Sequence, residues 1–207
     1  MNKVMKKLIL ASNNKHKIDE IKAILSDLPI EVRSLKEENI DIDVEEDGKT
    51  FKENAEKKAN EIADFLKRNG ESNFIVLADD SGLEVDYLNG EPGIYSARYS
   101  GIHGDDKKNN EKLLKKLKGV PFEKRGASFI CYLVLVTSDD KVMSIKGEVR
   151  GVILEELSSE GGFGYDPLFY YEPLEKTFSE IAGSEKNRVS HRGKALEKLK
   201  ENIKEIL

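Results

Sequence analysis

Two adjacent carboxylates, Asp79 and Asp80, are the residues whose placement most needs a chemical explanation. They follow the apolar run 74–78, FIVLA, which has the length and composition of a buried strand. Carboxylates there are costly if they are buried without partners. Because successive side chains of a strand point to opposite faces, we expect only one of the two to enter a ligand site. Taken alone, the stretch is equally compatible with a strand end that leads into a solvated turn.

A second polar segment, residues 12–17 (SNNKHK), lies between a predicted strand and a predicted helix. The free N–H groups at a helix start, with a lysine one turn further on, form an anion site suited to phosphate groups. Many helices begin in this way without binding a ligand. The segment is therefore a candidate phosphate site that needs support from the rest of the chain.

An acidic loop precedes the second predicted helix, and its carboxylates could hold a metal ion. The side chains concerned are Asp41, Asp43, Glu45, Glu46 and Asp47. Most of them suit a solvated loop. One or two could join Asp79 or Asp80 around a hard cation, because Mg²⁺ takes few carboxylates and completes its shell with water and substrate phosphates.

Two segments near the C-terminus could recognise an organic group. In residues 161–167, GGFGYDP, glycines flank Phe163, which could stack on a base or simply belong to a turn beside the core. In residues 185–192, EKNRVSHR, His191 and Arg192 begin a predicted helix, where cations oppose the helix dipole. An anionic or carbonyl-rich ligand would explain that placement. The three histidines are scattered without paired spacing and do not indicate zinc.

The composition excludes several other classes of protein. Net charge near −5, with both signs interspersed, argues against a general binder of nucleic acid or membranes. The single cysteine, Cys131, lies in an apolar strand pattern and permits neither an intramolecular disulfide nor a cysteine-based zinc site. No apolar run reaches the roughly 18 residues that a membrane span needs. We therefore expect a soluble, cytoplasmic protein.

The elements that must position these residues follow an α/β pattern. A strand is expected over 4–11, then a helix with Ile21 and Leu25 on its apolar face, capped by Ser12 or Asn13. Residues 30–35 form another predicted strand. Thr50 and Glu53 make a capping-box pattern for a second helix that ends near 69–70. The apolar stripe of that helix is Phe51, Ala55, Ala59, Ile62 and Leu66, and Asn54 and Lys58 share a face beside it.

The second half of the chain completes a mixed sheet. A helix is predicted over 105–118, and strands over 127–137 and 141–153 are joined by a short turn as an antiparallel hairpin. Ser190 is expected to cap a C-terminal helix with an apolar face of Leu196, Leu199, Ile203 and Ile206. With no repeat and no linker-like stretch, residues 1–207 are predicted to form a single α/β domain whose sheet bends into two lobes around a central cleft.

Seven motifs occur in the order and spacing of one known family. They are SNNKHK, EED, TFKENAEKKA, ADDSGL, GEPGIYSARYSG, GGFGYDP and EKNRVSHRGKAL. Together they resemble the inosine/xanthosine triphosphate pyrophosphatase family over essentially the whole chain. The resemblance implies an elongated mixed sheet with two lobes around a central nucleotide cleft, a homodimer, and Mg²⁺-dependent hydrolysis of ITP, dITP or XTP to the monophosphate and pyrophosphate. No nucleic acid or membrane partner is expected.

The resemblance also implies a role for individual residues. Asp80 would accept the proton and bind the metal, together with Glu46 or else Glu45 or Asp79. Lys58 would reach the phosphates and Ser81 would lie beside the substrate. The triphosphate would contact Ser12, Asn13, Asn14, Lys15, His16 and Lys17, with Asn14 and Lys17 as the principal contacts. The base would be surrounded by Phe163, Gly164, Tyr165, Asp166, Lys186, His191 and Arg192. The usual family pattern has glycines where this chain has Asn13 and His16.

Elementary chemistry agrees with these roles and leaves two alternatives open. Attack on the α-phosphorus needs positive charge on the triphosphate, a hard metal and an oriented water. A 6-oxo group of the base can accept hydrogen bonds from Lys186 or Arg192, whereas the 6-amino group of adenine would leave donors unpaired. The alternatives are a Maf-like pyrophosphatase for modified pyrimidines or other nucleotides, and a nucleotide sensor without turnover.

Overall fold

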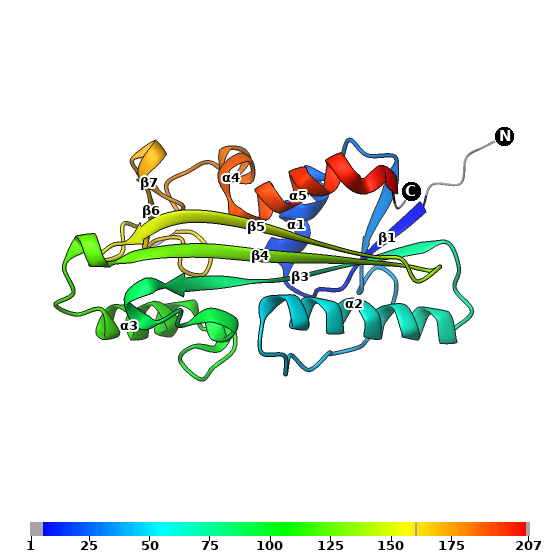
Figure 1. The fold of residues 1–207 in the computed structure, drawn as a ribbon, viewed down its shortest axis with the longest axis horizontal. Helices are drawn as coiled ribbons and strands as arrows, with labels where there is room; N and C mark the ends of the chain where they lie inside the picture. The colour runs from blue at the N-terminus through cyan, green and yellow to red at the C-terminus, as the bar shows by residue number, and fades with distance from the viewer. Residues whose placement is uncertain (1–5, 160, 206–207) are drawn as a thin grey trace. The chain divides into compact units, whose positions relative to one another are not determined.

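The computed structural model describes residues 6–159 and 161–205, and their strands form one mixed sheet (Figure 1). The strand order is β2-β1-β3-β4-β5-β6-β7. The strands are β1 (Lys6–Leu10), β2 (Ile30–Ser34), β3 (Phe74–Val85), β4 (Gly126–Thr137), β5 (Val142–Ile153), β6 (Phe169–Tyr171) and β7 (Lys176–Thr177). β1 pairs in parallel with β2 and β3, whereas β6 pairs antiparallel with β5 and β7. The predicted mixed sheet is confirmed.

Helices flank this sheet, and the sequence predicts each α-helix of the described residues except the one over Gly183–Val189. The α-helices are α1 (Lys15–Ile24), α2 (Phe51–Arg68), α3 (Asp106–Lys116), α4 (Gly183–Val189) and α5 (His191–Asn202). Short 3₁₀ helices cover Asp86–Leu88, Gly93–Arg98, Phe122–Lys124, Glu172–Leu174 and Ile203–Glu205. None of the helices in the described part of the chain combines the length and apolar composition needed to cross a membrane.

The chain divides into two compact units. Unit 1 comprises the residues up to Asp80, Tyr132–Gly147 and the chain from Ala195 on; unit 2 comprises Ser81–Cys131 and Glu148–Lys194. The division falls between Asp80 and Ser81, within strand β3. Each unit buries its own apolar cluster.

Unit 1 is organised by α2, whose apolar stripe is buried as predicted. The stripe packs with β1 and β3 residues such as Ile9, Val76 and Ala78. Thr50 caps the helix by accepting a hydrogen bond from Glu53 N at 3.1 Å, so this predicted cap is confirmed. α1 lies on the opposite face of the sheet from α2 (Figure 1).

The predicted cap of α1 is wrong by one or two residues. Asn14 is the N-cap, because its backbone is extended and its side chain accepts from Lys17 N at 3.2 Å. Ser12 instead accepts from Asn14 N at 3.2 Å, one step before the helix. On the apolar face Ile21 and Leu25 are fully buried, as expected.

Unit 2 packs α3 and α4 around a second apolar cluster that includes Leu113, Leu117 and Phe178. Ser190 accepts a hydrogen bond from Gly193 N at 3.1 Å, which confirms it as the cap of α5. A Cβ at Gly193 would lie 1.8 Å from the carbonyl oxygen of Asn187, so only glycine allows α4 and α5 to meet here. Of the predicted apolar face of α5, Leu196, Leu199 and Ile203 are buried, and Ile206 lies outside the described residues.

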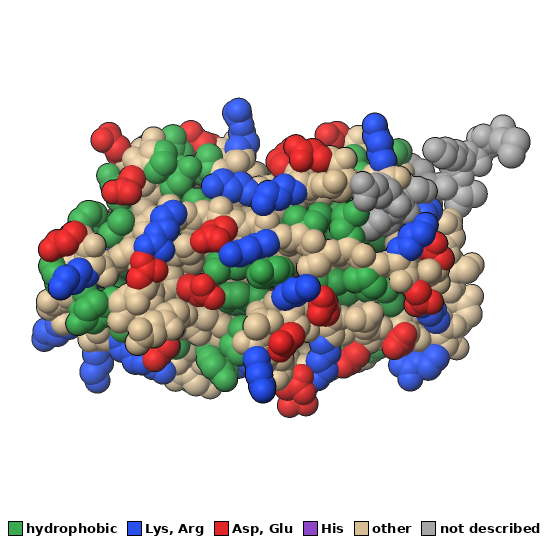
Figure 2. Space-filling view, viewed as in Figure 1, with side chains coloured by type: hydrophobic (Ala, Val, Ile, Leu, Met, Phe, Trp, Pro, Cys, Tyr) green, Lys and Arg blue, Asp and Glu red, His purple; other side chains and the backbone are tan. Residues whose placement is uncertain are grey.

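Surface charge follows the expectation from composition. Lys and Arg side chains alternate with Asp and Glu over the face shown in Figure 2, with small apolar areas between them. No extended area of one sign covers that face. The visible surface therefore lacks the continuous basic area that a general nucleic-acid binder uses.

Candidate active site

The two carboxylates at the border of unit 1 turn to different helices, as strand alternation predicts. Asp79 accepts a hydrogen bond from Lys17 Nζ, on α1, at 2.6 Å. Asp80 faces α2, where Asn54 Nδ2 lies at 3.1 Å and Lys58 Nζ at 3.5 Å. Both carboxylates are buried. Each therefore has a positively polarised partner that offsets the cost of its burial.

Helix α2 presents Asn54 and Lys58 together because they are one turn apart on the same face. Asn54 is fully buried; its Oδ1 accepts from Gly48 N at 2.8 Å while its Nδ2 donates to Asp80. The helix period predicts that Asn54 lies beside Lys58, but no role is predicted for Asn54. The missed signal is a lone amide next to an alanine-rich stripe, which indicates a close polar partner.

The acidic loop contributes Glu46 rather than Glu45. Glu46 accepts a hydrogen bond from Lys58 Nζ at 3.0 Å, and Glu45 is exposed. Ile42 and Val44 pack on the core of unit 1, so in an extended chain Glu46 turns inward with them and Glu45 turns outward. Lys58 consequently lies between Glu46 and Asp80.

Burial and charge set the protonation of this acid–lysine cluster, which we define as Lys17, Glu46, Asn54, Lys58, Asp79 and Asp80. Burial raises the pKa of Asp80 above its ordinary value, and the ammonium groups of Lys58 and Lys17 counter this only in part. Although burial lowers the pKa of Lys58, the charges of Asp80 and Glu46 raise it overall. Lys58 thus stays a cation, and Asp80 becomes a better proton acceptor than a surface aspartate.

The segment 12–17 lies at the start of α1 in unit 1. Lys17 lies beside Asp79, and Asn14 is held as the cap of the helix. Ser12 is half-buried, whereas Asn13, Lys15 and His16 are exposed. Of the predicted triphosphate contacts, the structure therefore brings Lys17 and Lys58 to adjacent carboxylates of β3.

In unit 2 two of the predicted base contacts, Phe163 and Lys186, bond to a third, Asp166. Lys186 Nζ lies 2.6 Å from Asp166 Oδ2, and both side chains are largely buried. The same oxygen accepts from Phe163 N at 3.2 Å, which ties the glycine-rich turn to α4. Phe163 and Gly164 are half-buried. The turn is thus held in place while Phe163 as a residue keeps some exposure.

The basic start of α5 is present, and its side chains are buried. His191 stacks on Phe129 with ring centroids 4.8 Å apart and an interplanar angle of 11°. Arg192 Nη2 donates to Ser81 Oγ at 3.0 Å. These contacts bring two predicted site residues of unit 2, Ser81 and Arg192, together, and they place the ring of His191 against Phe129.

Tyr165 occupies a different environment from its predicted neighbours. Its ring lies in the apolar cluster of unit 2, and its hydroxyl donates to Ser96 O at 2.8 Å. Burial raises the pKa of this hydroxyl far above its ordinary range. The side chain of Tyr165 therefore serves the core and anchors the turn to the segment around Ser96.

Fold and site together place the chain in a known class. Residues 8–202 match the Ham1 family, and the chain belongs to this family. A dITP/XTP pyrophosphatase of Clostridium perfringens is 62% identical over 203 residues, which cover 98% of this chain and 100% of the relative. A dITP/XTP pyrophosphatase of Clostridium tetani is 47% identical over 203 residues, which cover 98% of this chain and 98% of the relative. The predicted family is therefore confirmed.

Solved structures agree with the sheet described above. A Ham1 protein of Staphylococcus aureus has a TM-score of 0.84 and 42% identity, with 98% of this chain and 100% of that chain covered. A HAM1 protein from Coxiella burnetii has a TM-score of 0.85 and 38% identity, with 97% and 100% covered. The α/β fold with a mixed sheet is thus the fold of the family.

Proposed function

We propose that this protein is an enzyme that hydrolyses deaminated purine nucleoside triphosphates, namely dITP, ITP and XTP, to the monophosphate and pyrophosphate. The observation that carries the proposal is the acid–lysine cluster, in which Asp80 is held by Asn54 and Lys58. Kinship supports the substrate class, because a relative 62% identical over its whole length is a dITP/XTP pyrophosphatase.

The two lysines of the cluster are suited to phosphate oxygens. Lys17 and Lys58 lie on different helices and are fixed by carboxylates before any ligand binds. Such fixed cations lose little conformational freedom on binding and stabilise charge that develops during phosphoryl transfer. Lys58 also donates to the backbone carbonyl of Asp79 at 2.9 Å, which limits its movement.

Asp80 is the proposed proton acceptor. Its raised pKa strengthens it as a base, and Asn54 fixes one of its oxygens by a hydrogen bond of 3.1 Å. The other oxygen lies toward Lys58 and is the candidate to orient the attacking water. Replacing Asn54 or Lys58 should therefore disturb both the position and the basicity of this carboxylate.

The donor set of the cluster fits Mg²⁺. Asp80 and Glu46 supply hard oxygen ligands on either side of Lys58, and Mg²⁺ commonly uses one or two carboxylates with waters and phosphates. Residues 6–159 and 161–205 contain no group of three or more acidic, His or Cys side chains arranged to hold a metal. When bound, the ion would neutralise phosphate charge during hydrolysis.

Unit 2 supplies the proposed contacts to the base. Lys186 and Arg192 are donors that suit the 6-oxo group of hypoxanthine or xanthine, and Phe163 offers a ring for stacking. Asp166 holds Lys186 at 2.6 Å and so fixes the direction of its ammonium group. Adenine would set its 6-amino donor against these donors, and such unpaired groups discriminate strongly.

One panel of substrates tests the function. Release of pyrophosphate from ITP, dITP, XTP, GTP, ATP and TTP is measured with Mg²⁺ and again with EDTA. We expect fast, Mg²⁺-dependent release from the first three. Turnover restricted to pyrimidine nucleotides would favour the Maf-like alternative, and binding without release would favour a sensor.

The proposal includes a homodimer in the cytoplasm, in which residues 1–207 act as a single enzyme domain. It is supported by the resemblance of the seven motifs to the pyrophosphatase family. Light scattering coupled to gel filtration tests the dimer, which would give twice the chain mass of 23.3 kDa. A monomeric mass at assay concentration would reject the dimer without touching the proposed reaction.

A further inference from the structure

Helix α3 holds the glycine-rich turn of unit 2 by hydrogen bonds to both backbone polar groups of Gly164. Asp106 Oδ2 accepts a hydrogen bond from Gly164 N at 2.8 Å, and Asn110 Nδ2 donates to Gly164 O at 2.9 Å. The two side chains are one helical turn apart, so they share a face of α3. A single helix therefore fixes the Gly164 backbone from two directions.

Gly164, which we call the hinge of the turn, directly follows Phe163. Gly164 has a φ of +61°, which other residues rarely adopt, and a Cβ there would meet nothing within 4 Å. Glycine is thus needed for conformation and not for space. Since Phe163 precedes this hinge directly, rotation of the Gly164 backbone would redirect the aromatic ring.

The side chain of Asn110 is held at a cost to stability. It is only 5% exposed, and its Oδ1 is buried without a hydrogen-bond partner among the residues that the structure describes. A buried acceptor left without a partner destabilises a fold, so an apolar residue would serve packing better. The hydrogen bond from Asn110 Nδ2 to Gly164 O is the polar contact that explains an asparagine at this position.

We propose that Asp106 and Asn110 are positioning residues for recognition of the purine base. They fix the hinge at Gly164 so that Phe163 is presented in one orientation for stacking. The inference rests on the proposed function, in which Phe163 contacts the base. It adds specificity residues on α3 that lie outside the glycine-rich turn.

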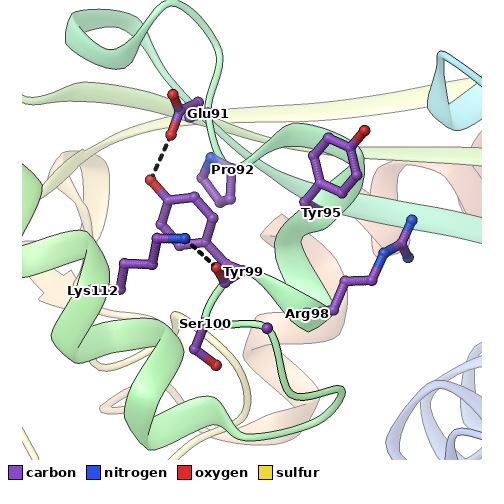
Figure 3. A pocket seen from close by; sticks show the side chains of 8 residues that line it. Glu91, Pro92, Tyr95, Arg98, Tyr99, Ser100 and Lys112 are labelled. Atoms are coloured by element: carbon purple, nitrogen blue, oxygen red, sulfur yellow. Dashed lines mark hydrogen bonds between the residues drawn. The ribbon is translucent and has the colours of Figure 1, made fainter.

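The neighbouring residue on α3 provides a matched control. Asn109 is also an asparagine, is 2% exposed, and holds a different segment: its Oδ1 accepts from Ser100 N at 2.7 Å. In the same segment Tyr99 O accepts from Lys112 Nζ (Figure 3). This segment borders a hollow of about 500 Å³. The hollow is lined by Glu91, Pro92, Tyr95, Arg98, Tyr99, Ser100, Gly101 and Lys112, none of which is a predicted base contact.

The kinetic test compares Asn110→Ala and Asp106→Ala with Asn109→Ala. We expect the KM for ITP to rise about fivefold to tenfold in the first two, the factor for one hydrogen bond of ordinary strength, with kcat nearly unchanged. Asn109→Ala should lower the melting temperature but leave KM as in the wild type. An equal rise in all three variants, or a rise in none, overturns the inference.

A spectroscopic test needs no turnover. The chain has no tryptophan, so Phe163→Trp introduces a single indole at the turn. Adding Asn110→Ala should lower its fluorescence anisotropy and increase its quenching by acrylamide, whereas adding Asn109→Ala should change neither. The same change with Asn110→Ala and with Asn109→Ala contradicts the proposed positioning role of Asn110. A wild type without ITP hydrolysis would reject the proposed function. An active wild type and an Asn110→Ala variant with the same KM would reject the positioning role alone.

Discussion

Replacing Asp80 by asparagine changes one charge and almost no volume, so it should separate catalysis from folding. Removal of a general base lowers a rate by about 10²–10⁴-fold, which corresponds to about 2.7–5.4 kcal/mol of activation free energy. The fold should survive, because Lys58 keeps Glu46 at 3.0 Å and the carbonyl of Asp79 at 2.9 Å. No buried ammonium is left without a partner.

The same substitution should stabilise the metal-free protein at neutral pH. Burial raises the pKa of Asp80 above that in the unfolded chain, about 3.9, even though Lys58 and Lys17 counter it. The stability that comes from a raised pKa is fully present below the unfolded value and is lost as the pH rises through the folded value. Asp80→Asn resembles the protonated form at every pH, so it should melt higher than the wild type at pH 7.

Two measurements check this reasoning. Initial rates of pyrophosphate release from ITP give the catalytic effect, and circular dichroism melts in EDTA at pH 7 and pH 3 give the stability effect. The two melting temperatures should converge at the lower pH, where Asp80 is protonated. A rate within tenfold of the wild type would refute the assignment of the base. A lower melting temperature at pH 7 would refute the argument from burial.

Three further substitutions test other parts of the structure. Glu46→Gln should raise the Mg²⁺ concentration for half activation by about tenfold or more, as for other groups around metal sites. The control Glu45→Gln changes an exposed side chain and should not raise it. Equal effects of the two variants in a Mg²⁺ titration would contradict the loop geometry. Arg125→Met should cost about 3–5 kcal/mol in urea unfolding, because the guanidinium group donates to carbonyls that include Leu117 O at 2.8 Å and Ile153 O at 2.6 Å; a loss below about 1 kcal/mol would show that water replaces it. Gly193→Ala should destabilise by about 2 kcal/mol or more, since its Cβ would overlap a carbonyl oxygen, and an unchanged melting curve would refute that contact.

Much of unit 1 follows from local pattern. The period of the helix predicts that Asn54 and Lys58 share a face, and the period of the strand predicts that Asp79 and Asp80 diverge. The choice of Glu46 over Glu45 could also have been derived, because Ile42 and Val44 set the inward side of the loop. What failed was the cap of α1, since Ser12, Asn13 and Asn14 are all good caps and only the backbone course selects Asn14.

The contacts of unit 2 depend more on tertiary structure. Asn110 and Gly164 are 54 residues apart, and no local pattern pairs them. Tyr165 illustrates the same limit, because an aromatic in a glycine-rich turn can face a ligand or the core with similar local sequence. Its hydroxyl bond to Ser96 O, 69 residues away, is visible only in the fold.

The two carboxylates at the end of the unit 1 portion of β3 illustrate why charge pairs alone do not identify a catalytic group. Asp79 is the more buried, and its carboxylate lies 2.6 Å from Lys17 Nζ, which is the geometry of an ion pair that holds α1 to the sheet. Asp80 shares Lys58 with Glu46 at a longer distance and takes its closest hydrogen bond from a neutral amide. A carboxylate that is buried but incompletely neutralised retains basicity, and burial raises the pKa of Asp80 accordingly. The difference in pairing therefore supports Asp80 as the proposed proton acceptor and Asp79 as the proposed partner that positions Lys17.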